Sequence, residues 1–161
     1  MFLYVLVVGL VLLILSIIYG AVYVPSVDWA VEEMIALAQV KKGERVVDLG
    51  SGNGKVLIAM ARKGAIAHGY EINPLLFIWS LFCIWKQGVW GKAHPHFGSF
   101  FHADLSSYAV ITIFVVPYIM PAVEQKVVKS AKKGTRIVVE TFPFPHLVPI
   151  KKEKSVYLYK L

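Results

Sequence analysis

Three glycines in the segment VVDLGSGNGK, residues 46–55, stand directly behind a short apolar run that includes an acid. Glycine has no Cβ atom and adopts positive φ readily, so such a loop lets the backbone approach a ligand closely. A loop of this kind between a strand and a helix is typical of sites for adenine-bearing cofactors. A dinucleotide fingerprint would need a third glycine at position 55, where this chain has Lys55. The spacing therefore disfavours NAD as the ligand.

The observed order, Gly50-Ser51-Gly52-Asn53-Gly54 preceded by Asp48, resembles motif I of the class I S-adenosylmethionine-dependent methyltransferases. The resemblance implies that this loop binds S-adenosylmethionine. The amino-acid end of that cofactor carries an ammonium, and its sulfur is a sulfonium. A carboxylate such as Asp48 beside the loop would compensate this positive charge.

Two more acids follow the next predicted strands. Glu71 ends the second strand, about twenty residues beyond the first glycine, where an acid can accept hydrogen bonds from both ribose hydroxyls. Asp104 follows the predicted third strand and is a candidate to accept from an adenine amino group. The alternative for each acid is a solvated loop residue. We expect all three acids to meet at one end of a sheet.

The elements that must position these residues alternate between strand and helix. Ser26 is predicted to N-cap a helix that ends near Val40. Short apolar runs predict the strands, and Gly or Pro residues bound the helices. The predicted strands cover 45–49, 65–71, 97–101, 110–116, 136–141 and 155–159, and further helices cover 55–63, 74–86 and 121–131. This order predicts an α/β fold with a doubly wound, mostly parallel sheet that binds its ligand at the carboxyl ends of the strands.

The first 24 residues contain no Lys, Arg, His, Asp or Glu. As a helix, residues 2–19 would span about 27 Å, close to the ~30 Å of a bilayer's hydrocarbon core. The apolar run is longer than that of a signal peptide and lacks a basic leading region. The sequence therefore predicts a single-pass membrane anchor over residues 1–24 and one domain over residues 25–161, which we expect on the cytoplasmic side.

The net charge of +7 belongs entirely to the part that follows this apolar run. A basic domain beside a bilayer is attracted to anionic lipid headgroups, by up to ~1 kcal/mol per well-placed cation. Nucleic acid is the competing partner for a basic domain, but no aromatic and basic recognition motif is present. We therefore expect a lipid bilayer and no nucleic acid among the partners.

Beyond motif I, further segments resemble the small membrane-anchored lysine methyltransferase family that includes the ATP synthase c-subunit and adenine nucleotide translocase lysine methyltransferases. These segments are YVPS at 23–26, GYEINPLL at 69–76, HADLSSY at 102–108, VVPYIM at 115–120 and TFPFPH at 141–146. The resemblance implies a Rossmann-like methyltransferase sheet, a lysine ε-amine of a membrane protein as acceptor, and cofactor contacts from Asn73 and Leu105. Only one strand is predicted after TFPFPH, so the C-terminal edge of the sheet is expected to be abbreviated.

The resemblance also places acceptor residues after the fourth strand and gives catalytic roles to Pro117 and Tyr118. Methyl transfer to an amine is an in-line displacement, which requires alignment and a neutral lysine. The Pro117 carbonyl would orient the amine, and the Tyr118 ring or hydroxyl would face a cationic nitrogen. The alternative is that Pro117 only ends the strand and begins the next helix.

Other functions stay open as alternatives. A membrane-anchored adaptor could keep the fold without catalysis. An NAD-dependent oxidoreductase is less favoured, because the chain also lacks a Tyr-x-x-x-Lys pair. His94, His96 and His102 do not have the spacing of metal ligands with a nearby Cys or carboxylate pair, so no metal is expected.

Overall fold

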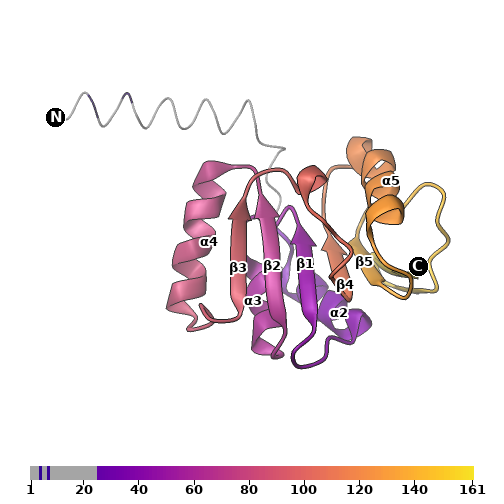
Figure 1. Ribbon diagram of the computed structural model, residues 1–161, viewed down its shortest axis with the longest axis horizontal. Helices are drawn as coiled ribbons and strands as arrows, with labels where there is room; N and C mark the ends of the chain where they lie inside the picture. The colour runs from indigo at the N-terminus through magenta and orange to yellow at the C-terminus, as the bar shows by residue number, and fades with distance from the viewer. Residues whose placement is uncertain (1–3, 5–6, 8–24) are drawn as a thin grey trace.

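The computed structural model describes residues 25–161 together with Tyr4 and Val7. Within these residues, seven strands form one sheet in the order β3-β2-β1-β4-β5-β7-β6 (Figure 1). The five strands from β3 to β5 are parallel, whereas β7 runs antiparallel to both β5 and β6. The strands are β1 (Arg45–Leu49), β2 (Ile66–Glu71), β3 (Ala93–Phe97), β4 (Val110–Ile113), β5 (Arg136–Glu140), β6 (Lys151–Glu153) and β7 (Val156–Lys160).

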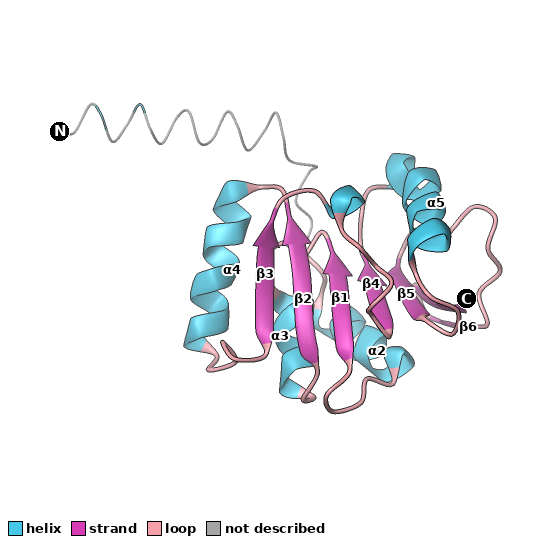
Figure 2. Cartoon of the chain, in the orientation of Figure 1, coloured by secondary structure: helices cyan, strands magenta, loops and turns pink. Residues whose placement is uncertain are grey.

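Helices cover both faces of this sheet. Figure 2 shows α2 and α3 behind the strands and α5 in front of them, with α4 alongside β3. The α-helices are α2 (Asp28–Ala38), α3 (Lys55–Arg62), α4 (Pro74–Lys86) and α5 (Met120–Ser130), and two short 3₁₀ helices are η1 (Phe100–His102) and η2 (Pro117–Ile119). The predicted doubly wound α/β architecture is confirmed.

The alternation of side chains along the strands divides the core into two layers. Val46, Val110 and Val138 pack with α2 and α3 on one face. Their neighbours Val47, Ile111 and Ile137 pack with α5 on the other face. Because successive side chains of a strand point to opposite faces, strands covered on both sides are apolar throughout. The carboxyl ends of β1, β2 and β4 are thereby held rigidly at one edge of the domain.

The predicted abbreviation of the C-terminal edge is wrong. Residues Lys151–Glu153 form the edge strand β6, which pairs with β7 in a hairpin where Glu153 lies opposite Val156. The sheet therefore has its antiparallel edge in full. The segment KKEK lacks the apolar alternation of a half-buried strand, and lysines on an edge strand are a common protection against edge-to-edge pairing. For that reason the sequence pattern predicted no strand at these residues.

The prediction of a single-pass anchor over residues 1–24 is not supported and is corrected here. Across Tyr4, Val7 and residues 25–161, no helix combines the length and the apolar character needed to span a bilayer. The rest of the predicted anchor lies outside the described residues. The cytoplasmic placement of the domain, which depended on the anchor, loses its support with it.

Candidate functional site

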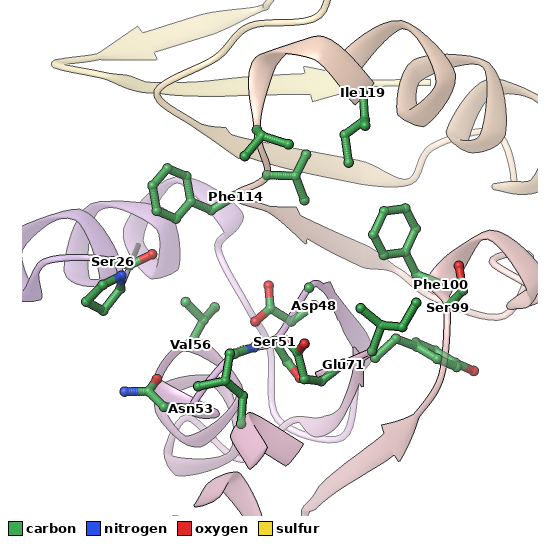
Figure 3. Close-up of a pocket in the computed structure, with 18 of the residues that line it drawn as sticks. Ser26, Asp48, Ser51, Asn53, Val56, Glu71, Ser99, Phe100, Phe114 and Ile119 are labelled. Carbon is green, nitrogen blue, oxygen red and sulfur yellow. Dashed lines mark hydrogen bonds between the residues drawn. The ribbon is translucent and has the colours of Figure 1, made fainter. Parts of the chain in front are cut away.

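A pocket of about 310 Å³ opens at the carboxyl ends of β1, β2 and β4, where the sequence predicted a ligand site. Figure 3 shows Asp48 and Ser51 in its middle, with Ser26, Asn53 and Val56 on one side and Glu71, Ser99 and Phe100 on the other. Phe114 and Ile119 close it from above in this view. The pocket is within the range of small-molecule sites and mixes apolar walls with a few charged groups.

The glycine loop forms one wall of this pocket. Gly50, Gly52 and Gly54 have φ of 84°, 52° and 79°, values that favour glycine. The loop is tied to β2, because the Gly50 and Ser51 N–H groups both donate to the carbonyl of Tyr70, at 3.0 and 2.9 Å. Gly50, Ser51, Gly52 and Asn53 line the pocket, whereas Gly54 lies against α4, where an added Cβ would stand 3.2 Å from Ser80.

Gly69 on β2 makes room for this loop. A Cβ at position 69 would lie 2.7 Å from the Ser51 Cβ and 2.8 Å from its Oγ, closer than side chains pack. Gly69→Ala is therefore expected to lower the free energy of unfolding by about 1–3 kcal/mol, as overpacking does. Denaturant unfolding would measure the loss. Gly91→Ala is the matched control, because nothing lies within 4 Å of its added Cβ, and it should stay within ~0.5 kcal/mol of wild type.

Asp48 is a buried carboxyl at the floor of the pocket. The Thr112 hydroxyl donates to its Oδ1 at 2.7 Å. The pKa of Asp48 is raised to about 7, chiefly by burial. The negative charges of Glu71 and Glu140 contribute to this rise, and the hydrogen bond from Thr112 opposes it. An ionised Asp48 is costly in this setting unless a cation binds beside it. The site is therefore suited to a positively charged ligand group.

Glu71 connects the glycine loop to the start of α4. Its Oε2 accepts from the Gly52 N–H at 2.8 Å, and its Oε1 accepts from the Asn73 N–H at 2.7 Å. Each carboxylate oxygen has two lone pairs, so both can accept a second hydrogen bond from a ligand. Asn73 does not line the pocket. Its side chain caps α4 by accepting from Leu75 and Leu76, so its position argues for a structural role.

The third predicted acid is not brought to the pocket. Asp104 is exposed and accepts from both the N–H and the hydroxyl of Ser106, hydrogen bonds that lower its pKa. Leu105 is fully buried in the core beside α5. The pocket wall at this point comes instead from Ser99, Phe100 and Phe101. β3 ends at Phe97, the residue at which the predicted strand of 97–101 begins. The residues that follow the observed strand therefore come earlier in the chain than Asp104.

Of the residues that follow β4, some line the pocket and Pro117 does not. Val115, Val116 and Tyr118 line the pocket, and Tyr118 is 76% exposed at its mouth. Pro117 begins η2, does not line the pocket, and its carbonyl accepts from the Met120 N–H. These contacts fit the alternative in which Pro117 starts a helix.

Several pocket residues were missed by the sequence reasoning. Pro25, Ser26, Lys55, Phe114 and Phe142 all line the pocket. Ser26 does not cap α2, whose cap is Val27 without a side-chain hydrogen bond. The Ser26 hydroxyl donates to Glu140 at 2.6 Å instead. The one signal for this segment was its place in the YVPS motif.

The histidines lie away from the pocket. His68 stacks on His96 with ring centroids 5.2 Å apart, and the His94 ring lies at the same centroid distance from His68. Burial lowers the pKa of His68 to about 4, and the neighbouring His96 adds to the effect. In the described part of the chain, no three His, Cys, Asp or Glu side chains are grouped to hold a metal ion.

The family model and the similar proteins agree in naming methyltransferases. The model of the ANTKMT methyltransferase domain family matches residues 48–151. The rat ATP synthase c-subunit lysine N-methyltransferase is 36% identical over 127 residues, which are 79% of this chain and 58% of the rat protein. A protein-lysine N-methyltransferase of Saccharolobus islandicus is 35% identical over 147 residues, 85% of this chain and 91% of that protein. The chain spans little more than half the length of its rat, human and mouse relatives of the c-subunit group.

A solved structure matches the fold. It is an RNA methyltransferase from Salinibacter ruber in complex with S-adenosyl-L-homocysteine, 28% identical, with a TM-score of 0.82. The match covers 85% of this chain and 93% of that one. A methyltransferase from Geobacter sulfurreducens, also in complex with S-adenosyl-L-homocysteine, has a TM-score of 0.65 and supports the fold alone at 20% identity.

Proposed function

Because the chain belongs to the ANTKMT methyltransferase domain family, we propose that it transfers a methyl group from S-adenosylmethionine to a lysine ε-amine of a protein. The observation that carries the proposal is the pair of buried carboxyls, Asp48 and Glu71, on either side of the glycine loop in one pocket. When bound, S-adenosylmethionine supplies a methyl group on a sulfonium, which an amine nitrogen can attack.

The residues of the pocket fit this cofactor. Asp48 offers negative charge where the ligand is cationic, and Glu71 keeps free lone pairs for two hydroxyls, as a ribose provides. Phe100 and Ile72 supply apolar walls near Glu71 that suit an adenine ring. The Ser51 hydroxyl is buried on the loop and has no hydrogen-bond partner among the described residues. A polar ligand would satisfy it.

The acceptor lysine is assigned to the mouth formed by Val115, Val116 and Tyr118. The walls there are apolar, which favours a lysine that has lost its proton and so can act as the nucleophile. The exposed Tyr118 ring can hold the amine by a cation–π contact or by its hydroxyl. We assign this role to Tyr118 and not to Pro117, which lies outside the lining.

Tyr118→Ala is expected to lower the rate of lysine methylation about tenfold or more, because alignment of the amine is the main requirement of the reaction. The side chain is 76% exposed, so the free energy of unfolding should not change measurably. Initial rates with labelled cofactor would measure the loss, and calorimetry should give an unchanged Kd for S-adenosylhomocysteine. An unchanged rate would remove Tyr118 from the acceptor site.

The substrate is proposed from the names of the relatives. They include enzymes named for the ATP synthase c-subunit and for adenine nucleotide translocase, both of them named as protein substrates. We propose a lysine in a membrane protein of this kind as the target. The comparisons name no lipid.

Cofactor binding is the first test. S-adenosylmethionine, S-adenosylhomocysteine and NAD would be titrated calorimetrically into the protein. Binding of the first two without NAD is the expected result. Binding of NAD alone would indicate an oxidoreductase, and binding of none would indicate an adaptor that keeps only the fold.

The acceptor is tested with S-adenosylmethionine labelled on the methyl group. Purified ATP synthase c-subunit and adenine nucleotide translocase would be incubated with the protein, and acid hydrolysates would be analysed for methyl-lysine. A substrate with the labelled lysine changed to arginine is the matched control. Label released by mild alkali would indicate a carboxyl ester, the chemistry named for the Flavobacterium psychrophilum relative. Label transferred to RNA would favour the chemistry named for the Salinibacter ruber structure.

A further inference from the structure

The described lining of the pocket offers two carboxyls but one cation to the charged groups of the proposed cofactor. Its amino-acid end carries a carboxylate as well as an ammonium. Asp48 and Glu71 repel a carboxylate. Among the described residues that line the pocket, Lys55 is the sole Lys or Arg, and His is absent from the lining. A bound carboxylate therefore has one cation available to it.

Lys55 lies at the end of the pocket opposite Glu71, where the carboxylate of the proposed cofactor is expected. Figure 3 places Glu71, Ser99 and Phe100 on one side, where the ribose and adenine are proposed to bind. Ser26, Asn53 and Val56 lie on the opposite side. The Lys55 ammonium is on that opposite side, because it donates to the Ser26 carbonyl at 2.8 Å. The amino-acid end of the cofactor points the same way if its ribose is at Glu71.

The ion pair between Lys55 and Asp28 is exposed enough for a ligand to replace Asp28. Its Nζ lies 2.6 Å from Oδ1 of Asp28, whose side chain is 88% exposed, while the Lys55 side chain is 35% exposed. Ion pairs this open to water contribute little stability. The other nearby acid, Glu140, is buried, does not line the pocket, and is held by the Ser26 hydroxyl. A ligand carboxylate can therefore replace Asp28 at small cost.

The helix start at Lys55 also favours a negatively charged ligand group. Lys55 is the first residue of α3, which Gly54 precedes as the cap residue, and Oδ1 of Asn53 accepts from the Lys55 N–H at 3.2 Å. The positive end of a helix dipole stabilises a nearby anion. Asn53 and Val56, which flank this helix start, both line the pocket.

We propose that Lys55 binds the carboxylate of the cofactor's amino-acid end and exchanges Asp28 for it. The assignment rests on the proposed function and adds a binding residue to it. It also gives a physical reason for a lysine, and not a third glycine, at position 55. The predicted selectivity is for adenosyl thioethers that carry a carboxylate over those that lack one.

The test compares two ligands that differ only in this group, S-adenosylhomocysteine and its decarboxylated form, 5′-(3-aminopropylthio)adenosine. Calorimetry with the wild-type protein and with Lys55→Met would give four dissociation constants. Lys55→Met is expected to weaken S-adenosylhomocysteine about tenfold, as loss of a charged hydrogen bond does, and to leave the decarboxylated ligand unchanged. Lys55→Arg should restore most of the affinity.

Asp28→Asn is the complementary variant. It removes the competing partner at an exposed position, so the fold should persist, and S-adenosylhomocysteine should bind about two- to fivefold tighter. Equal weakening of both ligands by Lys55→Met would mean that Lys55 only supports the loop, and no change in either would also overturn the inference. If the wild-type protein bound neither ligand, the proposed function itself would fail.

Discussion

Asp48→Asn is expected to stabilise the ligand-free protein at pH 8 while it weakens cofactor binding. The carboxyl is buried, and its pKa is raised to about 7 from an ordinary value near 3.8, chiefly by burial. The folded protein therefore binds more protons than the unfolded chain between about pH 4 and pH 7. Its stability falls as the pH rises through that window, and the full cost of the charge is present above pH 7. Asparagine keeps an oxygen for the Thr112 hydroxyl and removes the charge.

The expected gain in the free energy of unfolding is about 2–4 kcal/mol at pH 8, and it should vanish near pH 4, where the wild-type carboxyl is protonated in the folded state. Denaturant unfolding at several pH values would measure it. A wild-type stability that rises between pH 4 and pH 7, with no gain in the variant, would contradict the burial of an ionised carboxyl at this place.

Cofactor affinity should rise with pH, whereas the stability of the ligand-free protein falls. A cationic ligand group binds the ionised form of Asp48, so affinity is greatest above pH 7 and falls as the carboxyl is protonated. Between pH 8 and pH 6 the Kd of S-adenosylhomocysteine should rise roughly tenfold, the ratio expected for a pKa near 7. Asp48→Asn should abolish this dependence. Asp104→Asn is the matched control, because that carboxyl is exposed and outside the pocket.

The glycine loop and the two acids beside it were predictable from sequence because they depend on local order. A glycine loop after an apolar strand fixes its own geometry, and Glu71 ends β2, which pairs with β1 in parallel register. The carboxyl ends of neighbouring parallel strands meet at one edge. The family was predictable for the same reason, since its motifs are short segments in a fixed order, and the match over residues 48–151 confirms it.

The errors came from features that local order does not determine. The strand β3 reads AHPHF, with Pro95 and two histidines, so its apolar pattern is weak and the strand was placed too late. The residues that follow β3 and line the pocket are therefore Ser99 and Phe100, and Asp104 lies outside that lining. Ser26 has the composition of a helix cap, but its hydroxyl donates to Glu140, 114 positions further along the chain. No local pattern reveals a partner at that separation.

The helix α4 shows a second limit. Its sequence is apolar nearly all round, yet only Ser80 and Ile84 are buried, and Ile78, Trp79 and Trp85 are more than half exposed. Hydrophobic periodicity identifies a buried face only when polar residues mark the other one. The side of α4 that packs on the domain contains the small residue Ser80, whose Cβ would lie 3.2 Å from a Cβ added at Gly54 of the glycine loop.

Glu71→Gln is expected to weaken S-adenosylhomocysteine about 100-fold, because the two hydrogen bonds proposed from the ribose to this charged acceptor would be lost or weakened. The carboxylate now accepts from the N–H groups of Gly52 and Asn73 through separate oxygens. A glutamine has one oxygen, so its NH₂ group must face one of these backbone donors. The glycine loop or the start of α4 then moves, and the free energy of unfolding should fall by about 1–3 kcal/mol.

Glu124→Gln separates the loss of stability from the loss of binding. Glu124 is also a buried carboxylate that accepts from backbone, from the N–H groups of His146 and Leu147, and its Oε2 lies 2.8 Å from Nδ1 of His146. It does not line the pocket. A glutamine there keeps one oxygen for both N–H groups but loses the negative charge and turns its NH₂ group toward Nδ1 of His146, so it should lower stability. The Kd of S-adenosylhomocysteine should nevertheless stay within about twofold of wild type. If both variants weakened binding equally, the effect of Glu71 would follow from general destabilisation and not from contact with the ribose.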